Sequence, residues 1–169
     1  MKTIKSISII GTIFVLIVGS LDHFLYQWSG QNHWVGLLCP VNESTWEHMK
    51  LVFFPMLFYS LFLCIKWRNQ FRPQFHVLAQ GILIGTFLIP VLFYTYTGIL
   101  GFHVFLLDLL TFGCSVIAGF SYIFHTLKSS SAKNHNRFAA PILLLLLFFL
   151  FWLFTYQPPS LGLFLPPNG

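Results

Sequence analysis

Charged residues are scarce in this sequence, and acidic residues are the scarcest. Asp, Glu, Lys and Arg together make up 8% of the 169 residues, whereas a soluble domain carries about 25%. Because 56% of the residues are apolar, a soluble globular fold is excluded. The net charge of +5 comes from having only four acidic residues and not from a basic patch, so we expect no nucleic-acid partner.

Cysteine is also scarce, and proline and glycine are present only at ordinary levels. The three cysteines, Cys39, Cys64 and Cys114, stand far apart and in no paired spacing, so they indicate neither a disulfide framework nor a structural zinc site. With nine prolines and 12 glycines, the chain is neither collagen-like nor disordered. An integral membrane protein remains, and we expect residues 1–169 to form a single domain.

Long apolar runs dominate the sequence. We expect five of them to cross the membrane, at residues 4–26, 44–65, 77–96, 102–124 and 139–156. At 1.5 Å per residue, runs of this length span, or nearly span, about 30 Å of hydrocarbon. They show no alternation of apolar and polar residues, and backbone groups cannot stay unpaired in lipid. The sequence therefore predicts an all-α, polytopic membrane helix bundle, with a loop at 29–41 that lies in the interface or among the helices, and a tail at 157–169.

The basic residues indicate which ends of these helices share a side of the membrane. Eight of the nine precede the first run or fall between the second and third or the fourth and fifth: Lys2, Lys5, Lys66, Arg68, Arg72, Lys128, Lys133 and Arg137. Only Lys50 falls on the other side. By the positive-inside rule, the amino terminus is cytoplasmic and the carboxyl terminus is outside. The apolar, proline-rich tail is then either a lid over the outer helix ends or an interfacial anchor.

The first run has an alternative interpretation. Residues 1–20 carry two lysines, an apolar stretch and a small-residue end, as a secretory signal peptide does. The apolar run continues past this end to Tyr26, which favours an uncleaved membrane helix. A mature amino terminus near Leu21 would leave four membrane helices.

The acidic residues are grouped at one level of the predicted bundle. All four lie on the outer side or in the outer half of a helix: Asp22, Glu43, Glu47 and Asp108. Four histidines map to the same level: His23, His33, His48 and His103. Ionisable groups are costly at membrane depth and usually face the bundle interior or a water-filled cavity. We therefore interpret this level as the candidate functional site.

The start of the second predicted helix contributes the most polar groups to this site. Ser44 and Glu47 have the spacing of a capping box, and carboxylates in a first turn complement the helix dipole, so a purely structural role is one interpretation. A functional role is the alternative. The apolar part of this helix, residues 51–65, is short, so the turn that carries Glu47, His48 and Lys50 is drawn into the membrane. Glu47 also reaches Lys50 at the i+3 spacing.

Helical spacing gives three further expectations. Glu43 and Glu47 are one turn apart and should share a helix face. His103 and Asp108 are separated by about 140° around a helix, so they meet only through a bound ion or a distorted first turn. A stripe of polar and small residues on the same helix should face inward, mainly for packing: Asp108, Thr111, Ser115, Gly119 and Tyr122.

Histidines and carboxylates at one level predict a cation site. One lysine cannot neutralise four carboxylates, and mixed ligands of this kind suit a divalent metal such as zinc. The expected ligands are Asp22, His23, Glu43, Glu47, His48, His103 and Asp108, and the residues expected to act in catalysis are Glu47, His48 and Asp108. A haem held by His23 and His103 is a further alternative.

Three parts of the sequence are distinctive: the string HFLYQWSG at 23–30, the core NESTWEHMK at 42–50, and a Leu-Phe pair at 163–164 that follows Gln-Pro-Pro at 157–159. Together they resemble a family of small bacterial multi-pass membrane proteins of unknown function that share an NESxWEHxK motif. The resemblance implies a bacterial cytoplasmic membrane location and a genuine site around Glu43, Glu47 and His48. It implies no particular activity.

Three classes of function remain open. The first is a metal-dependent hydrolase or transferase that acts on a lipid or lipid-linked substrate at the outer leaflet. The second is an ion- or proton-coupled transporter that uses Asp22, Glu47 and Asp108. The third is a non-catalytic assembly or immunity protein, whose polar cluster only fixes helix packing. The sequence contains no HExxH or GxSxG motif, so an enzyme assignment depends on the cluster alone.

Overall fold

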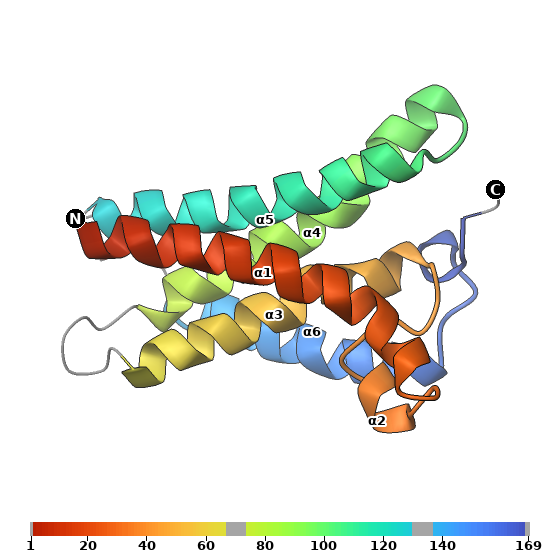
Figure 1. The fold of residues 1–169 in the computed structure, drawn as a ribbon, viewed down its shortest axis with the longest axis horizontal. Helices are drawn as coiled ribbons and strands as arrows, with labels where there is room; N and C mark the ends of the chain where they lie inside the picture. The colour runs from red at the N-terminus through yellow and green to blue at the C-terminus, as the bar shows by residue number, and fades with distance from the viewer. Residues whose placement is uncertain (1, 67–73, 130–136, 168–169) are drawn as a thin grey trace.

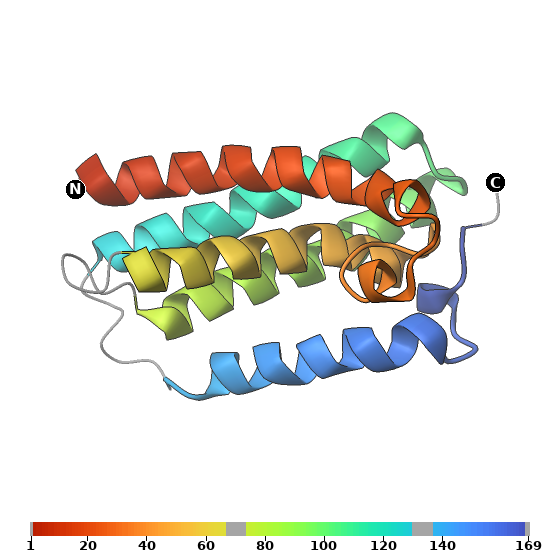
Figure 2. The same cartoon turned by 60° about the horizontal axis from the view of Figure 1, so that its bottom comes forward.

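Five long helices run lengthwise through the molecule (Figures 1 and 2). In the computed structural model, which describes residues 2–66, 74–129 and 137–167, they are α1 (Lys2–Trp28), α3 (Thr45–Lys66), α4 (Phe75–Leu100), α5 (Phe105–Lys128) and α6 (Ala139–Tyr156). The described residues also form a short helix α2 (His33–Gly36) and a 3₁₀ turn η2 (Gly162–Phe164), and they include no strand. Each of the five long helices has the length and apolar composition needed to cross a membrane, which confirms the predicted all-α, multi-pass bundle.

The connection between α4 and α5 is a tight reversal. α4 continues past its expected end at Tyr96 and stops before Gly101, whose φ of 81° is left-handed and suits a glycine. α5 starts later than the expected position, Phe102, because Val104 is extended, with φ −131° and ψ 121°. The residues just before α5 therefore do not follow its helical spacing.

α3 is the central helix of the bundle and lies between α1 and α6 in Figure 2. It packs against α1 and α4, and Val52, Phe53, Phe54 and Met56 are fully buried along it. A helix that is apolar on all sides is expected to occupy such a position. The first turn of α3 consequently lies where several other helices end or begin.

α4 and α5 approach each other closely along small residues. A Cβ atom added to Gly119 would come within 2.7 Å of the Gly81 carbonyl oxygen, and one added to Gly85 within 3.0 Å of the Ser115 carbonyl oxygen. Thr111 and Ser115 are buried. The polar and small stripe of α5 thus packs inward, as membrane helices do when they pack closely.

The segment between α1 and α3 folds against the bundle. The Asn32 side chain caps α2 by accepting a hydrogen bond from the Trp34 N–H at 2.9 Å. Leu37 and Cys39 are buried, whereas Trp34 is 73% exposed. An exposed tryptophan here suits an anchor at a membrane–water interface.

The two ends of the bundle carry different charges. α1, α4 and α6 end, and α3 and α5 begin, at the end that also holds α2 and η2, on the right in Figure 1. All four acidic residues and Lys50 lie at this end, which we call the acidic end. The opposite, basic end carries Lys5, Lys66, Lys128 and Arg137, while Arg68, Arg72 and Lys133 lie outside the described residues.

Candidate functional site

A cavity of about 610 Å³ opens at the acidic end between α1, α3, α4 and α5. Most of its wall is apolar, and Phe24, Ile89, Leu109 and Phe112 contribute to it. The ionisable residues that line it are His23, Glu43, His48, His103 and Asp108. Five of the seven residues predicted as metal ligands therefore face one cavity, and Asp22 and Glu47 do not.

The tail that follows α6 folds over this end. Phe164 is buried, and its ring centroid lies 4.9 Å from that of Trp46 and 5.3 Å from that of Phe154. Pro166 and Pro167 then line the cavity. These contacts favour the interpretation of the tail as a lid.

His23, Glu43 and His48 form a cluster in which one candidate ligand atom from each residue lies within 4.8 Å of the others. His23 lies near the end of α1, His48 in the first turn of α3, and Glu43 just before α3. Glu43 Oε2 is 3.4 Å from His48 Nε2, and Glu43 Oε1 is 3.8 Å from His23 Nε2. Glu43 is 62% exposed, so a small ion can reach the cluster.

The backbone fixes the orientation of the His48 ring. Its Nδ1 lies 2.9 Å from the Ser44 carbonyl oxygen. Because a carbonyl oxygen can only accept, Nδ1 carries the hydrogen in this contact. In the neutral ring, Nε2 then directs a lone pair toward the Glu43 carboxylate. That arrangement is unfavourable unless the ring is protonated or a cation lies between the two groups.

A second polar group lines the cavity from the start of α5. The Tyr96 hydroxyl donates a hydrogen bond to Asp108 Oδ1, and His103 Nδ1 lies 3.4 Å from Asp108 Oδ2. His103 and Asp108 contact each other directly, because α5 begins after His103 and the angle of a regular helix does not apply to the pair. The extended backbone at Val104 allows the His103 ring to contact the first turn of α5.

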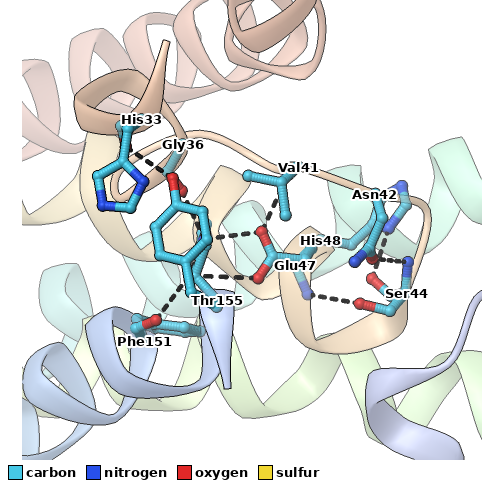
Figure 3. Close-up of polar contacts among 11 residues, drawn as sticks. His33, Gly36, Val41, Asn42, Ser44, Glu47, His48, Phe151 and Thr155 are labelled. Carbon is cyan, nitrogen blue, oxygen red and sulfur yellow. Dashed lines mark hydrogen bonds and ion pairs between the residues drawn. The ribbon is translucent and has the colours of Figure 1, made fainter. Parts of the chain in front are cut away.

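Glu47 does not line the cavity, and its buried carboxylate faces Val41 and Thr155 (Figure 3). Its carboxylate accepts hydrogen bonds from the Lys50 ammonium at 2.7 Å and from the Val41 N–H at 3.0 Å. Glu47 is 2% exposed and Lys50 0%, so the predicted i+3 contact is confirmed as a buried ion pair. The expectation that Glu43 and Glu47 share a helix face is wrong, because α3 begins at Thr45 and Glu43 precedes it.

Lys50 joins three parts of the chain. Besides Glu47, its ammonium group donates hydrogen bonds to the Gly36 carbonyl oxygen at 3.0 Å and to the Thr155 hydroxyl at 2.6 Å. The Thr155 hydroxyl donates in turn to the Phe151 carbonyl oxygen in α6 at 2.6 Å (Figure 3). All three ammonium donors are thus satisfied. The sequence held no signal for Thr155, which lies 105 residues from Lys50 along the chain.

Asp22 and His33 are not among the described residues that line the cavity. Asp22 instead lies near Cys39. Burial raises the pKa of the Cys39 thiol to about 12, with a further contribution from the Asp22 carboxylate, and the Lys50 ammonium group opposes this shift. His33 stacks on Tyr156 with ring centroids 4.0 Å apart, and its carbonyl oxygen accepts from the Tyr156 hydroxyl. The three carboxylates of the transporter hypothesis, Asp22, Glu47 and Asp108, therefore have separate surroundings.

Comparison with known proteins gives a family and no activity. Residues 1–167 match a family described as a family of unknown function (DUF6512). Neither the curated proteins nor the solved structures include a match.

Proposed function

The chain belongs to the DUF6512 family of unknown function, and from its cavity we propose that it is a metal-dependent membrane enzyme acting on a lipid or lipid-linked substrate. The observation that carries this proposal is the cluster of His23, Glu43 and His48 on the wall of an apolar cavity. Two histidines and one carboxylate are the protein ligands of a common class of catalytic zinc site, in which the fourth position is open to water or substrate.

The dimensions of the cluster are compatible with a small divalent metal ion, of which zinc is the one we propose. With metal–ligand bonds of about 2.0–2.2 Å, tetrahedral ligand atoms lie about 3.4 Å apart. In the cluster, His48 Nε2 lies 3.4 Å from Glu43 Oε2, and His23 Nε2 lies 3.8 Å from Glu43 Oε1, so each histidine faces a different oxygen of the same carboxylate. His48 also donates its Nδ1–H to a backbone carbonyl, as metal-binding histidines commonly do to present Nε2.

The lining of the cavity supports a neutral lipid as substrate. A volume of about 610 Å³ is in the usual range for small-molecule sites, and the wall is mostly apolar. No Lys or Arg is among the described lining residues, so an anionic headgroup would meet no basic side chain there. Glu43 and Asp108 contribute two negative charges, which one divalent cation would balance. We therefore favour a lipid with an uncharged acyl ester or amide group.

The proposed location is the bacterial cytoplasmic membrane, with the acidic end outside. The concentration of basic residues at the other end supports this orientation through the positive-inside rule. The resemblance of residues 42–50 to the NESxWEHxK motif of small bacterial membrane proteins supports the location. The cavity then opens toward the outer leaflet.

Titration with Zn²⁺ tests the metal site. The detergent-purified protein is treated with a chelator and titrated in a calorimeter. We expect one Zn²⁺ per chain, and an affinity at least about tenfold lower after His23→Ala or His48→Ala. The matched control is His125→Ala, because His125 lies near the end of α5 at the basic end and should not affect binding. Equal binding by wild-type and His48→Ala protein would refute the site.

Lipid turnover tests the enzymatic part. Metal-loaded protein in phosphatidylcholine vesicles is given diacylglycerol as the neutral lipid and phosphatidylglycerol as the anionic lipid. Mass spectrometry should detect fatty acid released from diacylglycerol by the wild-type protein and not by His48→Ala. Metal binding without release from either lipid would contradict the enzyme proposal.

A non-catalytic assembly protein is the second candidate, and one observation favours it. Glu47 and Lys50, two charged residues of the NESTWEHMK segment, are fully occupied in connecting α3 to the preceding loop and to α6. That use of the segment is structural. If the Zn²⁺ titration shows no specific binding, this candidate replaces the first.

A further inference from the structure

His103 and Asp108 line the same cavity as His23, Glu43 and His48, but they come from a different part of the fold. Asp108 lies in the first turn of α5, and His103 lies just before that helix. The cluster comes from α1 (His23), from α3 (His48) and from the segment just before α3 (Glu43). Among the described residues, the set with the spacing of a metal site is His23, Glu43 and His48 alone. The second group is therefore available for a different task.

Asp108 is fixed by contacts to both of its carboxylate oxygens. The Tyr96 hydroxyl donates to Oδ1, and the Val104 N–H donates in turn to the Tyr96 oxygen at 3.4 Å. The other carboxylate oxygen, Oδ2, lies 3.4 Å from His103 Nδ1. An ionised carboxylate can only accept hydrogen bonds, so a hydrogen bond in this contact requires the hydrogen on Nδ1 of His103.

This contact leaves Nε2 as the acceptor atom of the His103 ring. Within the described parts of the chain, no hydrogen bond or ion pair involves Nε2. The side chain is 35% exposed and lines the cavity. An imidazole with its Nδ1–H held by a carboxylate and its Nε2 open to substrate has the geometry of a general base. His48 differs, because its Nδ1 is held by a backbone carbonyl and its Nε2 faces Glu43.

We propose that His103 is the proton-transfer residue of this site and that Asp108 and Tyr96 are its positioning residues. The inference rests on the proposed function, with an acyl ester or amide lipid as substrate. The oxygen of a water molecule forms a bond to the carbonyl carbon while His103 Nε2 takes a proton from the water. The bond from that carbon to the leaving oxygen or nitrogen then breaks, and the leaving group takes the proton from Nε2. One water molecule is consumed, and His103 and Asp108 return to their starting states.

The tautomer of His103 tests this assignment. In protein labelled with ¹⁵N-histidine, imidazole NMR signals distinguish Nδ1–H from Nε2–H, and His103→Gln assigns the signal. We expect Nδ1–H as the main tautomer in the wild-type protein. Asp108→Asn should shift the population toward Nε2–H, because the amide can donate to Nδ1; Asp108→Glu should restore Nδ1–H. Asp22→Asn is the matched control and should leave the His103 tautomer population unchanged. A wild-type His103 in the Nε2–H form would overturn the proposal, and this measurement requires no folded Asp108 variant.

Adding Zn²⁺ to the same sample separates the inference from the proposed function. We expect the His23 and His48 signals to shift and the His103 tautomer to remain Nδ1–H. If His103→Gln lowers Zn²⁺ affinity as much as His48→Ala, His103 is a ligand, and the inference fails while the proposed function stands. If no histidine signal responds to Zn²⁺, the proposed function fails, and the inference falls with it.

Discussion

Glu43 and Glu47 are one helical turn apart in sequence and have opposite surroundings in the structure. Glu43 is 62% exposed and contacts two histidines at the cavity, whereas Glu47 is 2% exposed and paired with Lys50. A buried charge that loses its partner is costly, while an exposed ion pair contributes little. The two glutamates therefore form a matched pair for experiments at the residue scale.

Replacing Glu47 by glutamine should destabilise the protein by about 3–5 kcal/mol, because the Lys50 charge stays buried without its partner. The free energy of unfolding can be measured in mixed SDS and dodecyl maltoside micelles. Glu43→Gln is the control and should change it by less than about 1 kcal/mol. If Glu47→Gln is as stable as the wild type and lacks activity, Glu47 is catalytic, as the sequence predicted, and its role in stability is refuted.

Cys39 should react slowly with thiol reagents in the folded protein. With its pKa raised to about 12 by burial and by Asp22, only about one thiol in ten thousand is ionised at pH 8, and the thiolate is the reactive form. In a Cys64→Ser, Cys114→Ser background, the labelling rate with a maleimide should rise about tenfold per pH unit between pH 7 and 9.

Asp22→Asn is the informative variant for this measurement. It removes a carboxylate that raises the pKa of Cys39, so labelling at a given pH should become faster. An unchanged rate would show that Asp22 does not act on this thiol.

At the scale of the helices, the sequence predicted the elements better than their contacts. The five apolar runs were sufficient to predict five helices, because a backbone in lipid must satisfy its own hydrogen bonds. Grouping the ionisable residues by depth placed His23, Glu43 and His48 in one set, which the structure brings within 4.8 Å of one another, but it also included Asp22 and Glu47, which do not line the cavity. The exact ends of α3 and α5 were not predictable from apolarity, since polar residues before a helix can fold in several ways.

The wrong prediction that Glu43 and Glu47 share a helix face has this origin, and so does the direct contact of His103 with Asp108. Helical spacing applies only after a helix has begun, and Glu43 and His103 each precede the helix that carries its predicted neighbour. Tyr96 and Thr155 were missed for another reason. Their partners come from other segments of the chain, and an ordinary tyrosine or threonine in an apolar helix gives no sign of them.

Thr155 connects α6 to Lys50, and replacing it by valine should cost about 1–3 kcal/mol, because one ammonium donor loses its partner while the side-chain shape is kept. Thr155→Ser should retain most of the stability. The control is Thr95→Val, since, within the described residues, the Thr95 hydroxyl bonds only to the Val91 carbonyl oxygen of its own helix. The same micelle unfolding assay applies, and a Thr155→Val protein as stable as the Thr95→Val control would contradict the bridging role.

For the whole molecule, α1 begins and α6 ends at opposite ends of the bundle (Figures 1 and 2). With the basic end in the cytoplasm, an alkaline phosphatase fused after Gly169 should be active outside, and one fused after Ser129 should be inactive. Green fluorescent protein at the same two positions is the complementary control and should give the reverse pattern. A cytoplasmic carboxyl terminus would refute either the five crossings or the orientation.

The Lys50 contacts also have a consequence for biosynthesis. The ammonium group is bonded to the segment before α3, to α3 itself and to α6. A chain emerging from the ribosome delivers α3 to the membrane well before α6. Until α6 arrives, one Lys50 N–H donor lacks its acceptor, the Thr155 hydroxyl, and the lysine is not covered by α6. An incompletely surrounded charge at membrane depth costs several kcal/mol. A chain truncated before α6 therefore lacks the Thr155 acceptor and exposes a lysine that the complete chain buries.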